Sequence, residues 1–232
     1  MGNVQVTDRY LRQSRLLPMD RVAQTTAAVM GVGAIGRQVA LMLSTLPLAK
    51  VDLVDPDLVE VHNIPTQQYR NEDVGMGKAE RTAIACREMG SDSLVGEWPM
   101  TAQQWWVEYG MKKGVDVVFL CVDSMTARRE IGRMVQAPLI VDGRMAAECG
   151  RVLSISKRGD RSYWMRTLCK DSEVFQETCT RQGTAYCANF AAAVMLSMFT
   201  RWLREAELER DVMFNMLADE MLPYCGQKEH KA

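Results

Sequence analysis

The sequence predicts an α/β protein with a doubly wound, mostly parallel β-sheet and an additional antiparallel part in its C-terminal third. Three features indicate this. Through residues 25–145, short apolar segments alternate with segments of helical periodicity, which is the pattern of parallel strands joined by crossover helices. A glycine-rich turn follows the first apolar segment. Residues 146–225 instead combine short strands, irregular loops and one long apolar helix.

The individual elements follow from these patterns. We expect strands over residues 27–30, 51–54, 93–97, 115–121 and 138–141, and helices over residues 40–46, 78–89, 102–111 and 126–134. In the C-terminal third we expect a hairpin that pairs 151–156 with 162–165 around a turn at 157–160, a buried helix over 184–203, and terminal strands over 212–217 and 221–224. Trp105 and Trp106 are expected in the core.

Composition and charge limit the classes of function. The 232 residues suffice for one large domain, and a chain with 47% apolar and 25% charged residues is typical of a soluble protein. The formal net charge of −1 gives no reason to expect nucleic acid as the main partner. No apolar run is long enough to span a membrane and no export signal opens the chain, so we expect a cytoplasmic protein without membrane contact.

Cysteine and histidine usage narrows the chemistry further. The seven cysteines are expected to be reduced thiols, as is usual for a chain without an export signal. No two of them form a Cys-x-x-Cys pair, so no zinc is expected. His62 and His230 are the only histidines, which argues against serine–histidine catalysis or a histidine-based metal site.

The glycine turn is the most informative local motif. Gly31 permits a tight turn after the first strand, Gly33 lets the backbone approach a phosphate, and Gly36 lets the helix lie close to the strand. Asp55 ends the second strand about 20 residues later, which is the spacing of a ribose acceptor. This pattern predicts a Rossmann-like nucleotide-binding unit, and an NAD-dependent oxidoreductase explains it as well as an ATP-dependent enzyme does.

The expected organisation is a single domain in four parts. An N-terminal helical arm (1–24) precedes the nucleotide-binding half (25–145). The hairpin, a cysteine-containing loop and the buried helix follow (146–225), and a short tail (226–232) ends the chain. Asp55 and Asp123 both follow strands of the parallel sheet, so they are expected to face the same crevice beyond its carboxyl edge.

Five features in order along the chain carry a family resemblance. They are the segment Arg9-Tyr10-Leu11-Arg12-Gln13, the glycine turn, Asp55-Pro56-Asp57 followed by Asn63, Lys78 at a helix start, and Asp123-Ser-Met-Thr-Ala-Arg128. Taken singly, each has an ordinary explanation, such as a solvated first turn of a helix for the arginines or a helix cap for Asp123. Together they resemble the ubiquitin-activating superfamily, in its bacterial ThiF and MoeB branch, from about residue 8 to about residue 203.

The resemblance implies adenylation of the C-terminal glycine of a ubiquitin-like or sulfur-carrier protein with ATP and Mg²⁺. It assigns Asp55 to the ribose, Asn63 to the nucleotide, Lys78 to phosphate charge and Asp123 to magnesium. Arg12 is expected to reach the phosphates of a partner subunit, which implies a homodimer. Asp57 and Gln67 are weaker candidates near the same nucleotide. A ubiquitin-conjugating-like enzyme is a further candidate partner.

The sequence also departs from the family pattern. The segment Asn63-Ile-Pro-Thr66-Gln67 stands where the family often has Asn-Leu-x-Arg-Gln, and Thr66 cannot supply the charge of that arginine. Arg37, directly after the last glycine, is a candidate substitute. The two zinc-binding Cys-x-x-Cys pairs of many members are absent.

Covalent transfer would require a cysteine nucleophile. Members that form a thioester carry it in the loop before the penultimate buried helix, which is the place of Cys179 with Arg181 beside it. Cys169, next to Lys170, competes for this role, whereas Cys187, Cys121 and Cys86 are expected to be core residues.

Several functions therefore stay open at this point. The leading interpretation is ubiquitin-like protein activation, with transfer of the product to an enzyme cysteine as a thioester. Sulfur-carrier adenylation without a stable thioester, adenylation of a tRNA base, an NAD-dependent oxidoreductase and a nucleotide-binding module without chemistry are the alternatives.

Overall fold

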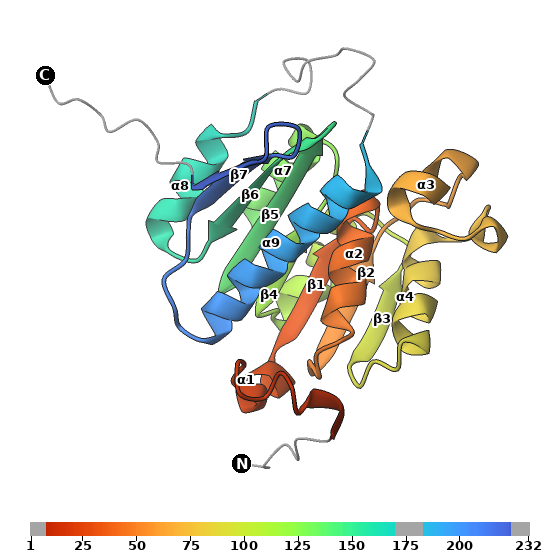
Figure 1. Cartoon of the computed structure of the whole chain (residues 1–232), viewed down its shortest axis with the longest axis horizontal. Helices are drawn as coiled ribbons and strands as arrows, with labels where there is room; N and C mark the ends of the chain where they lie inside the picture. The colour runs from red at the N-terminus through yellow and green to blue at the C-terminus, as the bar shows by residue number, and fades with distance from the viewer. Residues whose placement is uncertain (1–7, 170–182, 224–232) are drawn as a thin grey trace, which may run out of the picture.

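The computed structural model describes residues 8–169 and 183–223, which form a central sheet between two layers of helices (Figure 1). The sheet has the strand order β3-β2-β1-β4-β5-β6-β7-β8. The strands are β1 (Thr26–Met30), β2 (Lys50–Val54), β3 (Leu94–Trp98), β4 (Val117–Leu120), β5 (Leu139–Ala146), β6 (Cys149–Ile155), β7 (Asp211–Asn215) and β8 (Glu220–Pro223). Strands β1 to β5 pair in parallel, and β6, β7 and β8 continue the sheet antiparallel. The predicted fold class is thus confirmed.

Helices cover both faces of the sheet. They are α1 (Met19–Gln24), α2 (Ala34–Leu43), α3 (Ile64–Gln67), α4 (Lys78–Glu88), α5 (Ala102–Trp105), α6 (Met111–Lys113), α7 (Met125–Met134), α8 (Arg158–Arg166) and α9 (Ala185–Leu203). Short 3₁₀ turns occupy Asp8–Tyr10, Val61–Asn63 and Asn71–Asp73, and Trp106–Gly110 form a π-helical turn. Helices α2, α4 and α9 pack on one face, and α5, α7 and α8 on the other (Figure 1).

The central strands β1 and β4 are almost entirely apolar because they are buried on both faces. In β4, Phe119 packs with the core of α2 and α9, whereas Val118 and Leu120 pack with the core of α5, α7 and α8. Phe119 contacts Phe199 of α9 edge to face, with 5.6 Å between the ring centroids. Trp105 and Trp106 are 1% and 3% exposed, so their predicted place in the core is confirmed.

Helix α2 begins earlier than the sequence pattern suggested. The predicted helix over 40–46 in fact starts at Ala34, directly after Gly33, and ends at Leu43. The glycines of the turn hide the start, because Gly36 belongs both to the turn motif and to the first turn of the helix. The N-terminus of α2 therefore opens directly onto the glycine turn.

The hairpin predicted around residues 157–160 is wrong. That segment is the start of α8, and the Asp160 carboxylate accepts the backbone N–H groups of Ser156 and Lys157 at 3.2 and 2.9 Å. Trp164 of α8 is 1% exposed, so the side of the helix that carries it packs on the core. The hairpin lies one element earlier, between β5 and β6, where Ala146 pairs with Cys149.

The N-terminal arm lies at the amino-terminal end of the sheet, next to α1 at the bottom of Figure 1. Its arginine-rich segment begins in a 3₁₀ turn over Asp8–Tyr10 and continues as turns rather than as an α-helix. Tyr10 is buried and donates a hydrogen bond of 2.5 Å to Asp92, and Arg9 donates to the Met89 carbonyl at 2.9 Å. Burial and the Asp92 carboxylate raise the pKa of Tyr10 to about 12.

Among the helices of residues 8–169 and 183–223, none combines the length and the hydropathy of a transmembrane segment.

Replacing Gly36 by alanine is expected to disrupt the turn. A Cβ atom there would lie 1.8 Å from the Gly31 carbonyl oxygen, and Gly31 itself has φ +86° and packs on the Cys121 backbone. Overpacking of this kind typically costs about 1–3 kcal/mol or more. We expect Gly36→Ala to lower the thermal unfolding midpoint by several degrees. Gly159→Ala is the matched control because a Cβ atom there meets nothing within 4 Å in an exposed helical turn. Equal stability of both variants would contradict the close approach at Gly36.

Candidate active site

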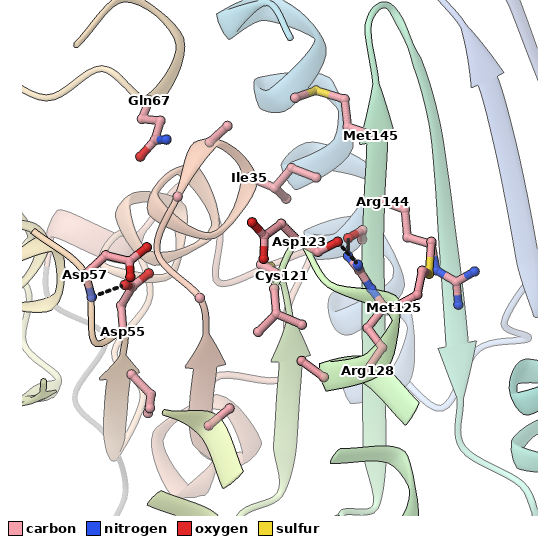
Figure 2. A pocket seen from close by; sticks show the side chains of 18 of the residues that line it. Ile35, Asp55, Asp57, Gln67, Cys121, Asp123, Met125, Arg128, Arg144 and Met145 are labelled. Carbon is pink, nitrogen blue, oxygen red and sulfur yellow. Dashed lines mark hydrogen bonds between the residues drawn. The ribbon is translucent and has the colours of Figure 1, made fainter. Parts of the chain in front are cut away.

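A pocket of about 690 Å³ opens beyond the carboxyl ends of β1, β2 and β4. Its walls come from the glycine turn, the end of β2, the starts of α4, α5 and α7, and the facing parts of β5, β6 and β7. Asp55 and Asp123 both line it, and they follow β2 and β4, the two strands that flank β1 (Figure 2). Such a crevice, where crossovers leave the sheet in opposite directions, is the usual ligand site of a doubly wound sheet.

Asp55 fixes the glycine turn to the end of β2. One carboxylate oxygen accepts the Val32 N–H at 2.7 Å, and the other accepts the Asp57 N–H at 2.9 Å. The residue is 5% exposed. Burial raises the pKa of Asp55, and the two N–H groups and the Lys78 charge oppose that rise. A ligand hydroxyl that donates to Asp55 would stabilise its charged form further.

Lys78 presents its ammonium group at the edge of the same pocket. Its Nζ lies 2.9 Å from the Asp57 carboxylate, and its backbone N–H donates to the Asp57 carbonyl at 2.9 Å. The Lys78 side chain is largely buried, whereas that of Asp57 is 63% exposed. An anionic ligand could therefore compete for the ammonium group without first removing the lysine from solvent.

Asp123 lies in the middle of the pocket, between Asp55 and Arg144 (Figure 2). The residue is exposed, and its backbone carbonyl accepts from Arg128 Nη1 at 3.2 Å. The same guanidinium donates through Nη2 to the Gly143 carbonyl at 2.8 Å. Arg128 thus fixes the backbone on which the Asp123 carboxylate is carried.

A buried carboxylate, that of Asp142, lies behind Asp123 and is connected to it through Arg128. Asp142 is 0% exposed and accepts from Arg128 Nε at 2.9 Å, from Arg144 Nε at 2.8 Å and from Trp164 Nε1 at 2.7 Å. Burial alone would raise the pKa of Asp142, but the two guanidinium groups outweigh it and hold the pKa below its usual value. Two cations face one anion here, which leaves an excess positive charge beside the pocket.

Residues of β5, β6 and β7 form the wall of the pocket that lies farthest from Asp55, which we call the far wall. Arg144 pairs with Arg151 across β5 and β6, and Arg151 pairs with Met213 across β6 and β7. All three line the pocket, as does the exposed Cys149 two residues before Arg151. Arg151 is held by Asp211 at 2.6 Å. Sequence reasoning missed these residues, because only the strand register brings them together on one face of the sheet.

The structure gathers most, but not all, of the predicted site residues. Gly31, Gly33, Asp55, Asp57, Gln67, Lys78 and Asp123 line the pocket. Asn63 does not, because it is buried with its side-chain oxygen accepting the Glu60 N–H at 3.0 Å. Arg12 is exposed on the N-terminal arm, away from the pocket of its own chain. Gly36 lies one helical turn behind the lining glycines.

Gln67 at the end of α3 and Arg37 in α2 differ in their relation to the pocket. The buried Oε1 atom of Gln67 has no hydrogen-bond partner among the described residues, and Gln67 faces the glycine turn (Figure 2). Arg37 does not substitute for the charge missing at Thr66 by a contact in the pocket. It is 4% exposed, outside the lining, and covers the Tyr69 ring at 4.2 Å.

The cysteines are only partly described. Cys179, the expected nucleophile, lies outside the described residues. Cys187 is 0% exposed and burial raises its pKa to about 11, so its predicted place in the core is confirmed. Cys86 is buried likewise, with a pKa raised to about 11. Cys121 is not a fully buried core residue as predicted, because it follows β4 at the pocket and is half-buried there. Desolvation nevertheless raises its pKa well above the ordinary thiol value. Cys169 is half-buried, and its carbonyl accepts from Arg129 at 3.1 Å.

Metal binding depends on the donor set. Within the described ranges, no group of three or more His, Cys, Asp and Glu side chains is arranged to hold a metal ion. The exposed Asp123 carboxylate is nevertheless a hard oxygen donor inside the pocket, which suits Mg²⁺ when phosphate oxygens supply further ligands. The residues present therefore fit a magnesium–nucleotide better than a protein-only metal site.

Asp142→Asn is expected to destabilise the protein strongly at neutral pH, because it leaves two buried guanidinium groups without a carboxylate. Removing one partner of a buried ion pair costs about 3–5 kcal/mol. The folded-state pKa of Asp142 lies below that of the unfolded chain, so its contribution is present above pH about 4 and is lost as the pH falls through the folded-state value.

Urea unfolding at several pH values measures this. The difference between Asp142→Asn and the unmodified protein should shrink as the pH falls below about 4. Glu205→Gln removes the exposed partner of Arg21 and should change stability by less than about 1 kcal/mol. A similarly small change in Asp142→Asn would show that the buried carboxylate is dispensable.

Known proteins are similar to this chain over about half of its length. Among curated proteins, the chain is 30% identical over 130 residues to the adenylyltransferase and sulfurtransferase MOCS3 of Mus musculus, covering 52% of this chain and 28% of that protein. It is 29% identical over 123 residues to ubiquitin-like modifier-activating enzyme 5 of Aedes aegypti, covering 48% of this chain and 31% of that protein. The match thus spans less than a third of the length of either relative.

Solved structures share the fold at lower identity. PaaA superposes with a TM-score of 0.71 at 17% identity, covering 91% of this chain and 67% of that one. Escherichia coli MccB with AMPCPP and MccA superposes with a TM-score of 0.72 at 15% identity, covering 96% and 72%. The ThiF family matches residues 8–216 of this sequence. Because that match covers most of the chain, this protein belongs to the ThiF family.

Proposed function

We propose that this protein uses Mg²⁺–ATP to adenylate the C-terminal carboxylate of a ubiquitin-like or sulfur-carrier protein. The observation that carries the proposal is the convergence of Asp55, Lys78 and Asp123 on one pocket beside a helix N-terminus. The names of the relatives, an adenylyltransferase and a ubiquitin-like modifier-activating enzyme, support the same chemistry.

Each of the converging groups suits a different part of the nucleotide. Asp55 is a charged acceptor for ribose hydroxyls, and the turn at Gly31 and Gly33 lets phosphate oxygens approach the N-terminus of α2. Lys78 would exchange part of its interaction with Asp57 for the phosphates. Asp123 would hold magnesium, which supplies positive charge for the phosphate groups when bound.

The far wall suits the acceptor. Beyond Asp123 the pocket continues to Arg144, Arg151 and Met213. Guanidinium groups already fixed by Asp142 and Asp211 can attract the acceptor carboxylate without being reorganised. An apolar side chain beside them would contact the carbon atoms of an extended C-terminal segment.

The reaction then needs little covalent participation from the protein. A carboxylate oxygen of the acceptor attacks the α-phosphorus of ATP, the bond from that phosphorus to the β-phosphate oxygen breaks, and pyrophosphate leaves. The products are an acyl adenylate and pyrophosphate. The side chains contribute position and charge, since negative charge increases on the leaving phosphates.

Assembly and covalent transfer extend this proposal. Because Arg12 lies away from the pocket of its own chain, it suits a role in the pocket of a second subunit within a two-fold homodimer. Cys179 is the proposed acceptor of the adenylated carbonyl, with AMP as leaving group and a thioester as product.

Nucleotide choice is the first test. We expect calorimetry to show binding of Mg²⁺–ATP and no preference for NAD, because Lys78 and Asp123 have tasks only with a triphosphate. Asp123→Ala should lower pyrophosphate exchange at least about 100-fold without loss of the folded state. Asp219→Ala, a carboxylate outside the pocket, is the control. Tight NAD binding without ATP binding would refute the proposal.

Composite sites are tested by mixing subunits. Arg12→Ala and Asp123→Ala proteins are each expected to be inactive, and a heterodimer should regain about a quarter to a half of normal activity through its one intact site. Exchange of subunits is verified with two affinity tags. Absence of recovery in verified heterodimers would mean that each site is built from one chain.

The covalent step is tested with a non-reducing gel of enzyme, ATP and acceptor. Cys179→Ala should keep pyrophosphate exchange and lose the thiol-sensitive adduct, because adenylation itself uses no thiol. Cys169→Ala is the matched control and should retain the adduct. If instead the adduct persists in Cys179→Ala and disappears in Cys169→Ala, the nucleophile is Cys169.

A further inference from the structure

Tyr69 lies directly behind the pocket and has no assigned role in it. The residue is 3% exposed and is not part of the lining. Its hydroxyl donates to the Val32 carbonyl at 2.7 Å and lies 3.3 Å from the Lys78 carbonyl. It is also 3.1 Å from the Thr82 hydroxyl. Burial raises the pKa of Tyr69, so the phenol keeps its proton at neutral pH.

These contacts join two elements that the proposed nucleotide site needs. Val32 belongs to the glycine turn, and its N–H is the group that Asp55 accepts. Lys78 opens α4 and carries the ammonium group at the pocket edge. One phenol oxygen therefore links the phosphate-side turn to the start of the lysine helix, although the two are far apart in the sequence.

Arg37 holds Tyr69 from the other side. Its guanidinium carbon lies 4.2 Å from the centroid of the Tyr69 ring, which is the distance of a cation–π contact. Arg37 Nε donates to the Gln68 carbonyl at 3.3 Å, and Nη1 donates to the Thr82 hydroxyl at 3.2 Å. Burial lowers the pKa of Arg37, but a guanidinium stays charged at neutral pH.

This arrangement matters for phosphate binding because the Thr66 side chain carries no positive charge. With that charge missing, binding of the phosphates depends on the turn and on Lys78, and so on the distance between them. We propose that Tyr69 is a positioning residue that fixes the glycine turn relative to the start of α4, and that Arg37 holds the Tyr69 ring in place. This inference rests on the proposed use of ATP.

A change in the position of the glycine turn relative to α4 should affect some ligands and not others, whereas a general loss of stability should affect all of them. Tyr69 touches elements on the phosphate side, so its hydroxyl should matter for Mg²⁺–AMPCPP and hardly at all for adenosine. One buried hydrogen bond corresponds to a change of roughly 3- to 10-fold in affinity. We expect Tyr69→Phe to weaken Mg²⁺–AMPCPP binding by about 5-fold and to leave adenosine binding within about 2-fold.

The control removes a comparable buried hydroxyl elsewhere. Thr25 is 4% exposed, donates to the Arg21 carbonyl at 2.7 Å and precedes β1 at the opposite end of the sheet. Thr25→Val and Tyr69→Phe should both lower the melting temperature by about 2–4 °C. Only Tyr69→Phe should weaken the triphosphate. Arg37→Met should act in the same direction as Tyr69→Phe, with Arg37→Lys in between.

Calorimetric titration of these variants separates the outcomes. Unchanged Mg²⁺–AMPCPP affinity in Tyr69→Phe overturns the inference and leaves the proposed function intact. Equal losses for the triphosphate and adenosine, or an equal loss in Thr25→Val, overturn it as well, because they indicate general loosening. If the unmodified protein binds no adenine triphosphate, the proposed function fails and the inference fails with it.

Discussion

The hydrogen bond from the Val32 N–H to the Asp55 carboxylate is the contact on which the site depends. It joins the glycine turn after β1 to the end of the neighbouring strand β2, with a distance of 2.7 Å in a buried environment. Because a buried carboxylate must be satisfied, the turn cannot move away without a large cost in free energy. The same bond thus fixes the N-terminus of α2 and orients the oxygen atoms that a ribose would meet.

A second constraint lies behind Asp123. Asp142 in the middle of β5 holds the guanidinium groups of Arg128 and Arg144, and Arg128 in turn holds the Asp123 carbonyl. This cluster is fully buried at its centre, so replacing one member leaves charge in a low-dielectric region. These hydrogen bonds therefore hold the guanidinium groups of Arg128 and Arg144 in place beside Asp123.

The parallel half of the fold could be predicted because its central strands β1 and β4 are buried on both faces and are almost entirely apolar. The segment around Trp164 could not, since only tertiary burial and the Asp160 cap make it helical. In the candidate site, the part of the pocket next to β1 and β2 could be predicted, because the sequence shows its glycine turn and the acidic residues that follow the strands. Arg144, Arg151 and Cys149 were missed because their proximity is a consequence of antiparallel register, which the sequence does not state.

The antiparallel extension also explains how one pocket could serve two anionic substrates. Next to β1 and β2, Lys78 and the N-terminus of α2 are the positive groups of the pocket, and the carboxylates of Asp55 and Asp57 lie beside them. Next to β5 and β6, Arg144 and Arg151 supply positive charge at fixed positions. Asp123 lies between these regions, where the two substrates would meet (Figure 2). A sheet that ended at β5 would lack both Arg151 of β6 and its partner Asp211 of β7, so these two added strands supply and hold the second guanidinium group of this region.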